Sequence, residues 1–130
     1  MLTKFTSLTI NPWLKIYLKF LAIIFTYSTI VHVTNILGFG EAPWLETPIT
    51  WRIGDVVYGF WDLLTAIGLW SLTIWGIASF LLAILSQFVI YNLFIDYFAF
   101  NAEQQATIDS LLATEAILIV IFLLLIMSKK

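Results

Sequence analysis

Residues 71–76, SLTIWG, join two long apolar runs of the chain. The runs cover about residues 52–72 and 76–95, and a helix needs about 20 mostly apolar residues to cross a bilayer. So short a link forces the two helices into an antiparallel hairpin. Gly76 suits the bend, because glycine tolerates backbone conformations that other residues avoid. The fold therefore begins with an antiparallel pair of apolar helices.

Two further apolar runs flank this hairpin, at about residues 13–37 and 108–127. Polar loops at residues 38–51 and 96–107 separate them from it. We expect a short interfacial turn at PWLE within the first loop. The sequence therefore predicts an all-α fold, an integral membrane four-helix bundle. Its four transmembrane helices form antiparallel up-down hairpins within a single membrane domain, residues 1–130.

The composition agrees with a membrane protein. Hydrophobic residues make up 62% of the chain and charged residues 11%, which is about half of the charged share of soluble domains. A soluble fold would have too little polar surface to cover so much apolar area, so we expect a lipid bilayer around the chain. The formal net charge of −2 argues against nucleic acid as a partner. The lack of cysteine excludes disulfides, thiolate zinc sites and iron–sulfur ligation.

Charge predicts the orientation of the helices. In a four-span arrangement every lysine falls on one side: Lys4, Lys15, Lys19, Lys129 and Lys130. Arg52 falls on the other side with most of the acidic residues, so the positive-inside rule places both termini in the cytoplasm. Two lysines lie within the first run, which favours an uncleaved helix over a signal peptide. The positions of the tryptophans agree with this orientation. We expect Trp13, Trp70 and Trp75 at the cytoplasmic interface, and Trp44 and Trp51 at the outer interface.

The polar residues within the four runs define the candidate site. A rise of about 1.5 Å per residue converts position in a helix into depth in the bilayer. By this measure Asp62 and Gln87 lie near the midplane, Glu115 lies slightly outward, and His32 and Asp55 lie further outward at nearly equal depth. The candidate buried polar cluster comprises Asp62, Glu115, His32, Gln87, Asp55 and Arg52.

Spacing predicts some of the contacts of this cluster. Arg52, Asp55 and Asp62 share one helix face, and Arg52 with Asp55 forms an i, i+3 pair. Asp62 has no basic residue at its depth, so we expect a neutral acid that donates to Gln87 or to a backbone carbonyl. Hydrogen bonds that hold helices together are expected from Gln87, Asn92 and Thr26. A small, polar face for close approach of another helix, within the bundle or between chains, is expected at Ser79, Ala83 and either Ser86 or Gln87.

Asp62 and Glu115 admit two interpretations. An acid inside a membrane is by default a functional-site hypothesis, because charge there is costly. Such residues also simply hold helices together. A metal site built from His32, Asp55 and the two acids is chemically possible, but no Glu-x-x-His spacing supports it. Because the chain also has no Ser–His–acid arrangement and no Gly-rich phosphate loop, we assign no catalytic residue, no metal ligand and no cofactor.

One stretch resembles known proteins. Residues 61–76, WDLLTAIGLWSLTIWG, contain an acid, small residues, GLW and a Trp–Gly turn. They resemble small four-helix bacterial membrane proteins of the broad DoxX-like kind and, more closely, an uncharacterised proteobacterial family. The resemblance implies a four-helix bundle that has no established activity and lies in a bacterial inner membrane. Asp62, the acid before GLW, is the single residue that the resemblance matches to a position in those proteins. Some DoxX-like proteins accompany oxidoreductases that act near quinones. Because this chain has no clear quinone motif, we do not assign that role to it from the resemblance.

Three functions are compatible with the sequence. The preferred one is a non-catalytic accessory or assembly subunit of a membrane complex or homo-oligomer, with a membrane protein as its partner. The second is a proton- or ion-handling transport protein that uses buried Asp62 and Glu115, and it requires a polar cavity connecting Asp62 to solvent. The third is a quinone- or haem-linked oxidoreductase membrane subunit. The sequence does not decide whether the protein is an enzyme, but it favours a protein without enzyme activity.

Overall fold

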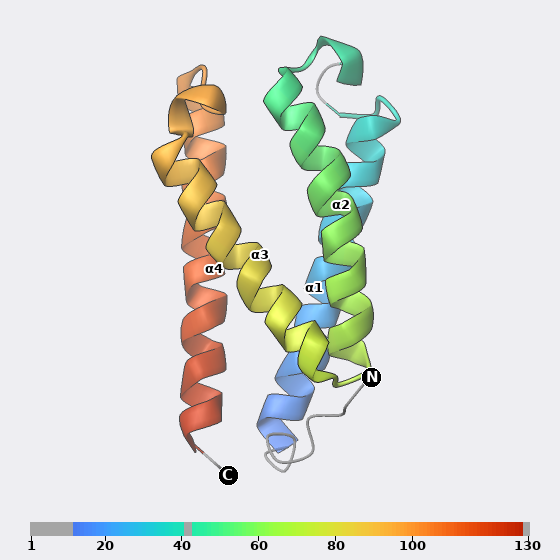
Figure 1. Cartoon of the computed structure of the whole chain (residues 1–130), viewed down its shortest axis with the longest axis vertical. Coiled ribbons are helices and arrows are strands. Elements are labelled where there is room, and N and C mark those ends of the chain that lie inside the picture. Colours follow the sequence, from blue (N-terminus) through green and yellow to red (C-terminus); the bar gives the residue numbers. More distant parts are fainter. Residues whose placement is uncertain (1–11, 41–42, 129–130) are drawn as a thin grey trace.

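A computed structural model describes residues 12–40 and 43–128 of the chain. The described residues form no β-strand, and the helices follow one another up and down (Figure 1). The four long helices are α1 (Pro12–Ile36), α2 (Ile49–Trp70), α3 (Ile74–Leu93) and α4 (Ala102–Ser128). Short 3-10 helices, η1 (Trp44–Glu46) and η2 (Ile95–Tyr97), lie in the two loops. The predicted all-α, antiparallel up-down arrangement is confirmed, as is the predicted turn at PWLE.

The fourth helix is longer than predicted. α4 begins at Ala102, so part of the expected polar loop at residues 96–107 is helical. Asn101 Oδ1 accepts from the Gln104 backbone N at 2.8 Å, and Gln104 Oε1 accepts from the Phe100 backbone N at 2.8 Å. This reciprocal cap satisfies backbone donors that have no partner within the helix. The helix therefore starts at its capping signal, upstream of the point where the apolar run starts.

Three of the described helices, α1, α3 and α4, are long and apolar enough to cross a membrane. α2 is not among them, so this measure supports three of the four predicted transmembrane helices. The reason is chemical, because α2 carries Arg52, Asp55 and Asp62 within its 22 residues. Both aspartates are buried against the rest of the chain.

The hairpin between α2 and α3 is tighter than the sequence suggested. Only Ser71, Leu72 and Thr73 separate the helices, and Leu72 takes the left-handed conformation with φ 57°. Thr73 Oγ1 donates to the Gly68 carbonyl at 2.9 Å and accepts from the Gly76 backbone N at 3.1 Å. Placing Gly76 in the bend was therefore wrong: it lies in the first turn of α3, where its backbone packs directly on Gly68.

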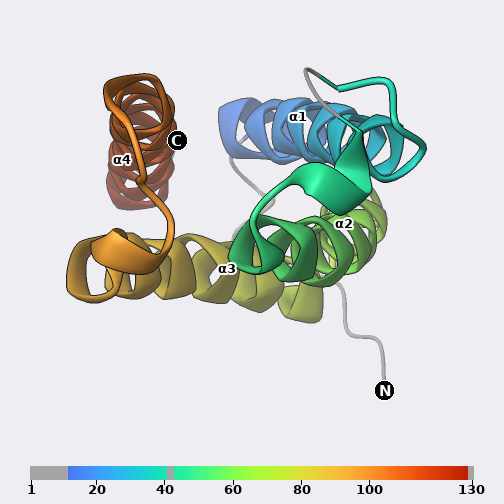
Figure 2. The ribbon, with the colours of Figure 1, turned by 90° about the horizontal axis from the view of Figure 1, so that it is seen from above.

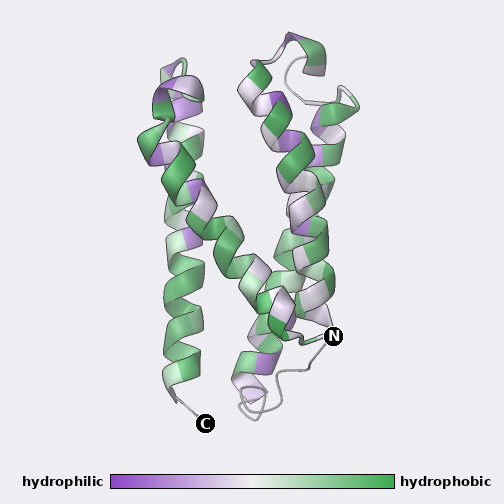
Figure 3. Cartoon of the chain, in the orientation of Figure 1, coloured by the Kyte–Doolittle hydropathy of each residue, from purple (hydrophilic) through white to green (hydrophobic). Residues whose placement is uncertain are grey.

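The helices pack most closely at the end where α1 begins and α4 ends. α1 lies along α2, and α3 crosses between this pair and α4 (Figures 1 and 2). Apolar side chains from all four helices form the core at this end: Leu14, Leu18, Leu21, Leu69, Phe80 and Phe122. Figure 3 shows hydrophilic residues concentrated toward the opposite end, where the two long loops lie. This end is called the loop end below.

Charges are segregated as the sequence predicted, within the described residues. Lys15 and Lys19 lie on the first half of α1, and the Lys19 Nζ donates to the Trp70 carbonyl at 3.0 Å. The same ammonium group lies 4.2 Å from the centroid of the Trp70 ring. A cation at this position complements the negative C-terminal end of the α2 dipole. Four further charged residues on which the predicted orientation depends lie outside the described residues: Lys4, Glu41, Lys129 and Lys130.

Candidate functional site

A cavity of about 520 Å³ lies between the four helices in the half of the molecule nearer the loop end. Its volume is in the range of small-molecule sites, which span about 300–1,000 Å³. It extends from Asp62 on α2 to Thr50, Trp51 and Phe98 at the loop end. Polar side chains from every long helix line it, among them Ser28, His32, Asp55, Tyr58, Asp62, Gln87, Tyr91 and Glu115.

One face of α1 supplies three polar groups to the site. Ser28, His32 and Asn35 recur at helical spacing, so they point toward the same neighbour, α2. They contact the two aspartates of that helix, Asp55 and Asp62. The expectation that His32 and Asp55 lie at equal depth is confirmed by the contact between them.

Asp55 is held by three donors. The His32 Nδ1 lies 2.8 Å from Asp55 Oδ1, the Asn35 Nδ2 donates to the same oxygen at 3.3 Å, and the Trp44 Nε1 donates to Oδ2 at 2.9 Å. The predicted pair of Arg52 with Asp55 is wrong. Arg52 turns toward the loop, where its Nε donates to the Thr47 carbonyl at 3.2 Å, and it does not line the cavity. The aspartate instead fixes α1 and the first loop onto α2.

Asp62 is buried and has fewer partners. The Ser28 hydroxyl donates to Asp62 Oδ2 at 2.6 Å, and the His32 Nε2 lies 3.8 Å from the same oxygen. The imidazole of His32 thus lies between two carboxyl groups, bonded to Asp55 and facing Asp62. It fits there because Gly59 has no side chain: a Cβ at Gly59 would lie 3.2 Å from the His32 Cβ. The expected contact of Asp62 with Gln87 is not found among the described residues.

Gln87 instead reaches across to α4. With its amide nitrogen turned toward Glu115, Gln87 donates to Glu115 Oε1 at 2.6 Å and also to Oε2. This orientation satisfies both groups, whereas the reverse one would bring oxygens together. Glu115 and Gln87 are both buried and both line the cavity. The prediction that Gln87 holds helices together is confirmed, with a different partner.

Hydroxyl groups join α2 to α3 beside the cavity. Tyr58 and Ser86 are hydrogen-bonded at 2.5 Å. Ser79 Oγ accepts from the Trp61 Nε1 at 2.9 Å and is bonded to Thr65 Oγ1 at 2.5 Å. The predicted small, polar face of the third helix is therefore confirmed, and it packs within the chain. The prediction that Thr26 and Asn92 hold helices together is wrong for their side-chain hydrogen bonds, because both side chains bond to carbonyls of their own helices.

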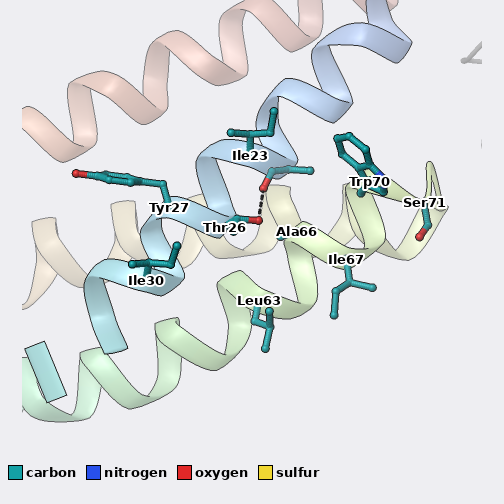
Figure 4. Close-up of a pocket in the computed structure, with 10 residues that line it drawn as sticks. Ile23, Thr26, Tyr27, Ile30, Leu63, Ala66, Ile67, Trp70 and Ser71 are labelled. Carbon is teal, nitrogen blue, oxygen red and sulfur yellow. Dashed lines mark hydrogen bonds between the residues drawn. The ribbon is translucent and has the colours of Figure 1, made fainter. Parts of the chain in front are cut away.

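A second hollow, of about 570 Å³, lies on the outside of the α1–α2 pair (Figure 4). Its lining is almost wholly apolar, with Ile23, Ile30, Leu63 and Ile67 around it. The Thr26 hydroxyl donates to the Ala22 carbonyl at 2.8 Å, so it offers no free donor there. This groove could hold hydrocarbon, but it lacks the groups for chemistry.

The main cavity has acid–base groups but no metal-binding arrangement. Within residues 12–40 and 43–128, no three His, Asp or Glu side chains gather closely enough to ligate one ion. Three carboxyl groups and a single imidazole line the cavity, together with tyrosine and serine hydroxyls. Such a set can take up, hold and release protons or positively charged groups.

Sequence reasoning overlooked Ser28, Asn35, Trp44 and Tyr91. The first two could have been found, because they lie four residues before and three after His32 on one helix face. Trp44 comes from a loop, and Tyr91 reaches the cavity only because α3 tilts across the molecule. No sequence pattern reports either of these placements.

Comparisons with known proteins give one match. No curated protein and no solved structure matches the chain. A family model described as "Family of unknown function (DUF6163)" matches residues 12–129, which include every helix and every residue of the cavity. This agrees with the expected resemblance to an uncharacterised family, and no DoxX-like family is matched. The chain therefore belongs to the DUF6163 family of unknown function.

Proposed function

We propose that this chain is a membrane transport protein that takes up protons or other cations into the cavity from the loop end. The observation that carries the proposal is the joint placement of Asp62, Glu115 and His32 around one cavity that extends to the loop end. An accessory subunit needs only paired polar groups, whereas a transport protein needs a polar cavity that leads to its buried acids. The cavity that leads from Asp62 to the loop end supports the transport function.

The proposal includes a membrane topology. All four helices cross a bacterial inner membrane, with the start of α1 and the end of α4 in the cytoplasm. Lys15 and Lys19 near the start of α1 support this, as do acidic Glu46, Asp96 and Glu103 around the loop end. α2 crosses despite its charges, because its aspartates face α1 and the cavity instead of lipid.

His32 is the natural relay group in this scheme. Histidine is the side chain that changes charge near neutral pH, and here its two ring nitrogens face two different carboxyl groups. A proton arriving at Asp55 would pass to the imidazole and on to Asp62. The 3.8 Å gap between His32 Nε2 and Asp62 Oδ2 requires a small ring movement or a bridging water. Because four helices are few for a pore, the transporting unit would be an oligomer.

Proton flux into proteoliposomes tests this proposal. We expect Asp62→Asn, which keeps the size of the side chain but cannot ionise, to abolish flux while the protein still folds. Asp109→Asn is the matched control, because Asp109 is exposed at the loop end of α4. Unchanged flux in Asp62→Asn, together with loss of stability in Asp62→Leu, would show that Asp62 only holds α2 in place.

A second candidate function is an accessory or assembly subunit, and the outer groove favours it. The apolar hollow between α1 and α2 in Figure 4 suits a helix of a partner or of a second copy. Purification in a gentle detergent, followed by identification of co-purifying proteins, tests this. The looser DoxX-like resemblance adds a quinone- or haem-linked role as a third proposal, which an absorption spectrum of the purified protein would test.

A further inference from the structure

We propose that the ligand of the main cavity is a lipophilic organic monocation, held with its charge beside Glu115 and Asp62 and its apolar groups against the aromatic lining. The proposal deepens the transport function above and rests on it for the role of the cavity. It follows from three independent properties of the lining: its charge, its aromatic side chains and its lack of metal-ligand geometry.

The titratable side chains of the lining are mostly acidic. Asp55, Asp62 and Glu115 are the acids there, and His32 is the sole basic residue among the described residues that line the cavity. Asp55 already has three partners, namely the His32 Nδ1, the Asn35 Nδ2 and the Trp44 Nε1. Asp62 accepts from the Ser28 hydroxyl and has the His32 Nε2 at 3.8 Å, whereas Glu115 accepts from the neutral Gln87 amide and has no basic partner among the described residues. A buried carboxylate without a positive partner is costly, and a cationic ligand would supply that partner.

The remaining lining suits a large apolar cation. Aromatic rings line the same cavity as the acids, among them Phe25, Trp51, Tyr58, Tyr91 and Phe98. Tyr91 and Phe98 meet edge to face at 5.0 Å between centroids, so one ring presents its face and the other its edge. Aromatic faces attract cations, more strongly where water is excluded. The Tyr91 hydroxyl has no hydrogen-bond partner within the described part of the chain.

Inorganic cations match the cavity less well. Calcium and magnesium need six or more oxygen ligands at short range, and the described residues offer no group of three convergent acids or histidines. A cavity of about 520 Å³ would leave such an ion loosely held. A proton fits any carboxylate and needs no cavity at all. An organic cation uses the volume and the apolar lining together with the acids.

Tetraphenylphosphonium and tetraphenylborate provide a direct test, because they match in shape and differ in the sign of their charge. Each is titrated calorimetrically into the full-length protein in detergent, with protein-free micelles as the blank. We expect saturable binding of tetraphenylphosphonium alone. Glu115→Gln should weaken it by about tenfold or more, and Asp109→Asn should leave it unchanged.

The two proposals fail in different ways. Equal binding of tetraphenylborate to the wild-type protein, or no saturable binding of tetraphenylphosphonium, overturns the ligand class even where proton flux is observed. Full binding by a folded Glu115→Gln variant also overturns it, and Asp62→Asn repeats that comparison if Glu115→Gln does not fold. Charge-selective binding without flux of any cation into proteoliposomes supports the ligand class and refutes transport.

Discussion

Replacing Gly76 with alanine should separate α2 from α3. A Cβ at this position would lie 2.2 Å from the Gly68 carbonyl carbon, 2.6 Å from its oxygen and 2.6 Å from the Leu69 nitrogen. All three atoms belong to backbone, so no side chain can rotate away. Ordinary contact begins at 3.4 Å, which requires the helices to part by about 1.2 Å at this point.

The expected cost follows from three terms. Overpacking of a close contact costs about 1–3 kcal/mol. Parting the helices also stretches the two hydrogen bonds of Thr73 to Gly68 and Gly76, each worth about 1 kcal/mol. Against this, alanine gains about 1 kcal/mol over glycine in a helix. The free energy of unfolding should therefore fall by about 2–4 kcal/mol.

Unfolding in mixed micelles by added dodecyl sulfate, followed by circular dichroism, measures this change. Gly54→Ala on α2 is the matched control, because a Cβ there meets nothing within 4 Å. It should be neutral or stabilising by up to about 1 kcal/mol. The reasoning is refuted if Gly76→Ala unfolds within about 0.5 kcal/mol of wild type, or if Gly54→Ala loses as much stability.

Three further substitutions test other contacts in the same unfolding assay. Asp55→Ala leaves three donors without an acceptor, so we expect a loss of about 3 kcal/mol, and an unchanged midpoint would contradict the assigned contacts. Thr73→Ala removes the cap of α3 and should cost about 1 kcal/mol, whereas Thr73→Ser should restore most of it. Tyr17→Phe removes the 2.6 Å bond to the Leu118 carbonyl, the link between α1 and α4, and should cost about 0.6 to 1.7 kcal/mol. A stabilised Tyr17→Phe would mean that this bond is not formed.

Much of the helical framework follows from the order of residues along the chain. The apolar runs at residues 13–37, 52–72 and 76–95 became α1, α2 and α3 with shifts of one to three residues at each end. Run length and loop length are local properties, so they can be read without knowing what packs where. The start of α4 was predicted at residue 108, where the apolar run begins. The helix begins at Ala102 instead, because the Asn101 cap decides the boundary.

The sequence predicted which residues belong to the candidate site better than it predicted which of them contact one another. Asp62, Glu115, His32, Gln87 and Asp55 all line the cavity, and Arg52 does not. Depth along a helix follows from the fixed rise per residue, which is why His32 and Asp55 were correctly placed at one level. Whether these residues carry the proposed function is the question that the flux and binding experiments address.

By itself, the sequence determined four helices, their antiparallel order and the segregation of charge between their ends. Only the tertiary structure decided which polar groups meet. The rotation of each helix about its axis, and its tilt against its neighbours, depend on packing such as the Gly68–Gly76 contact, and no local pattern encodes them. Because of this rotation and tilt, Gln87 contacts Glu115, whereas Asp62 contacts Ser28 and His32. The same tilt also opens the cavity to which both proposals refer.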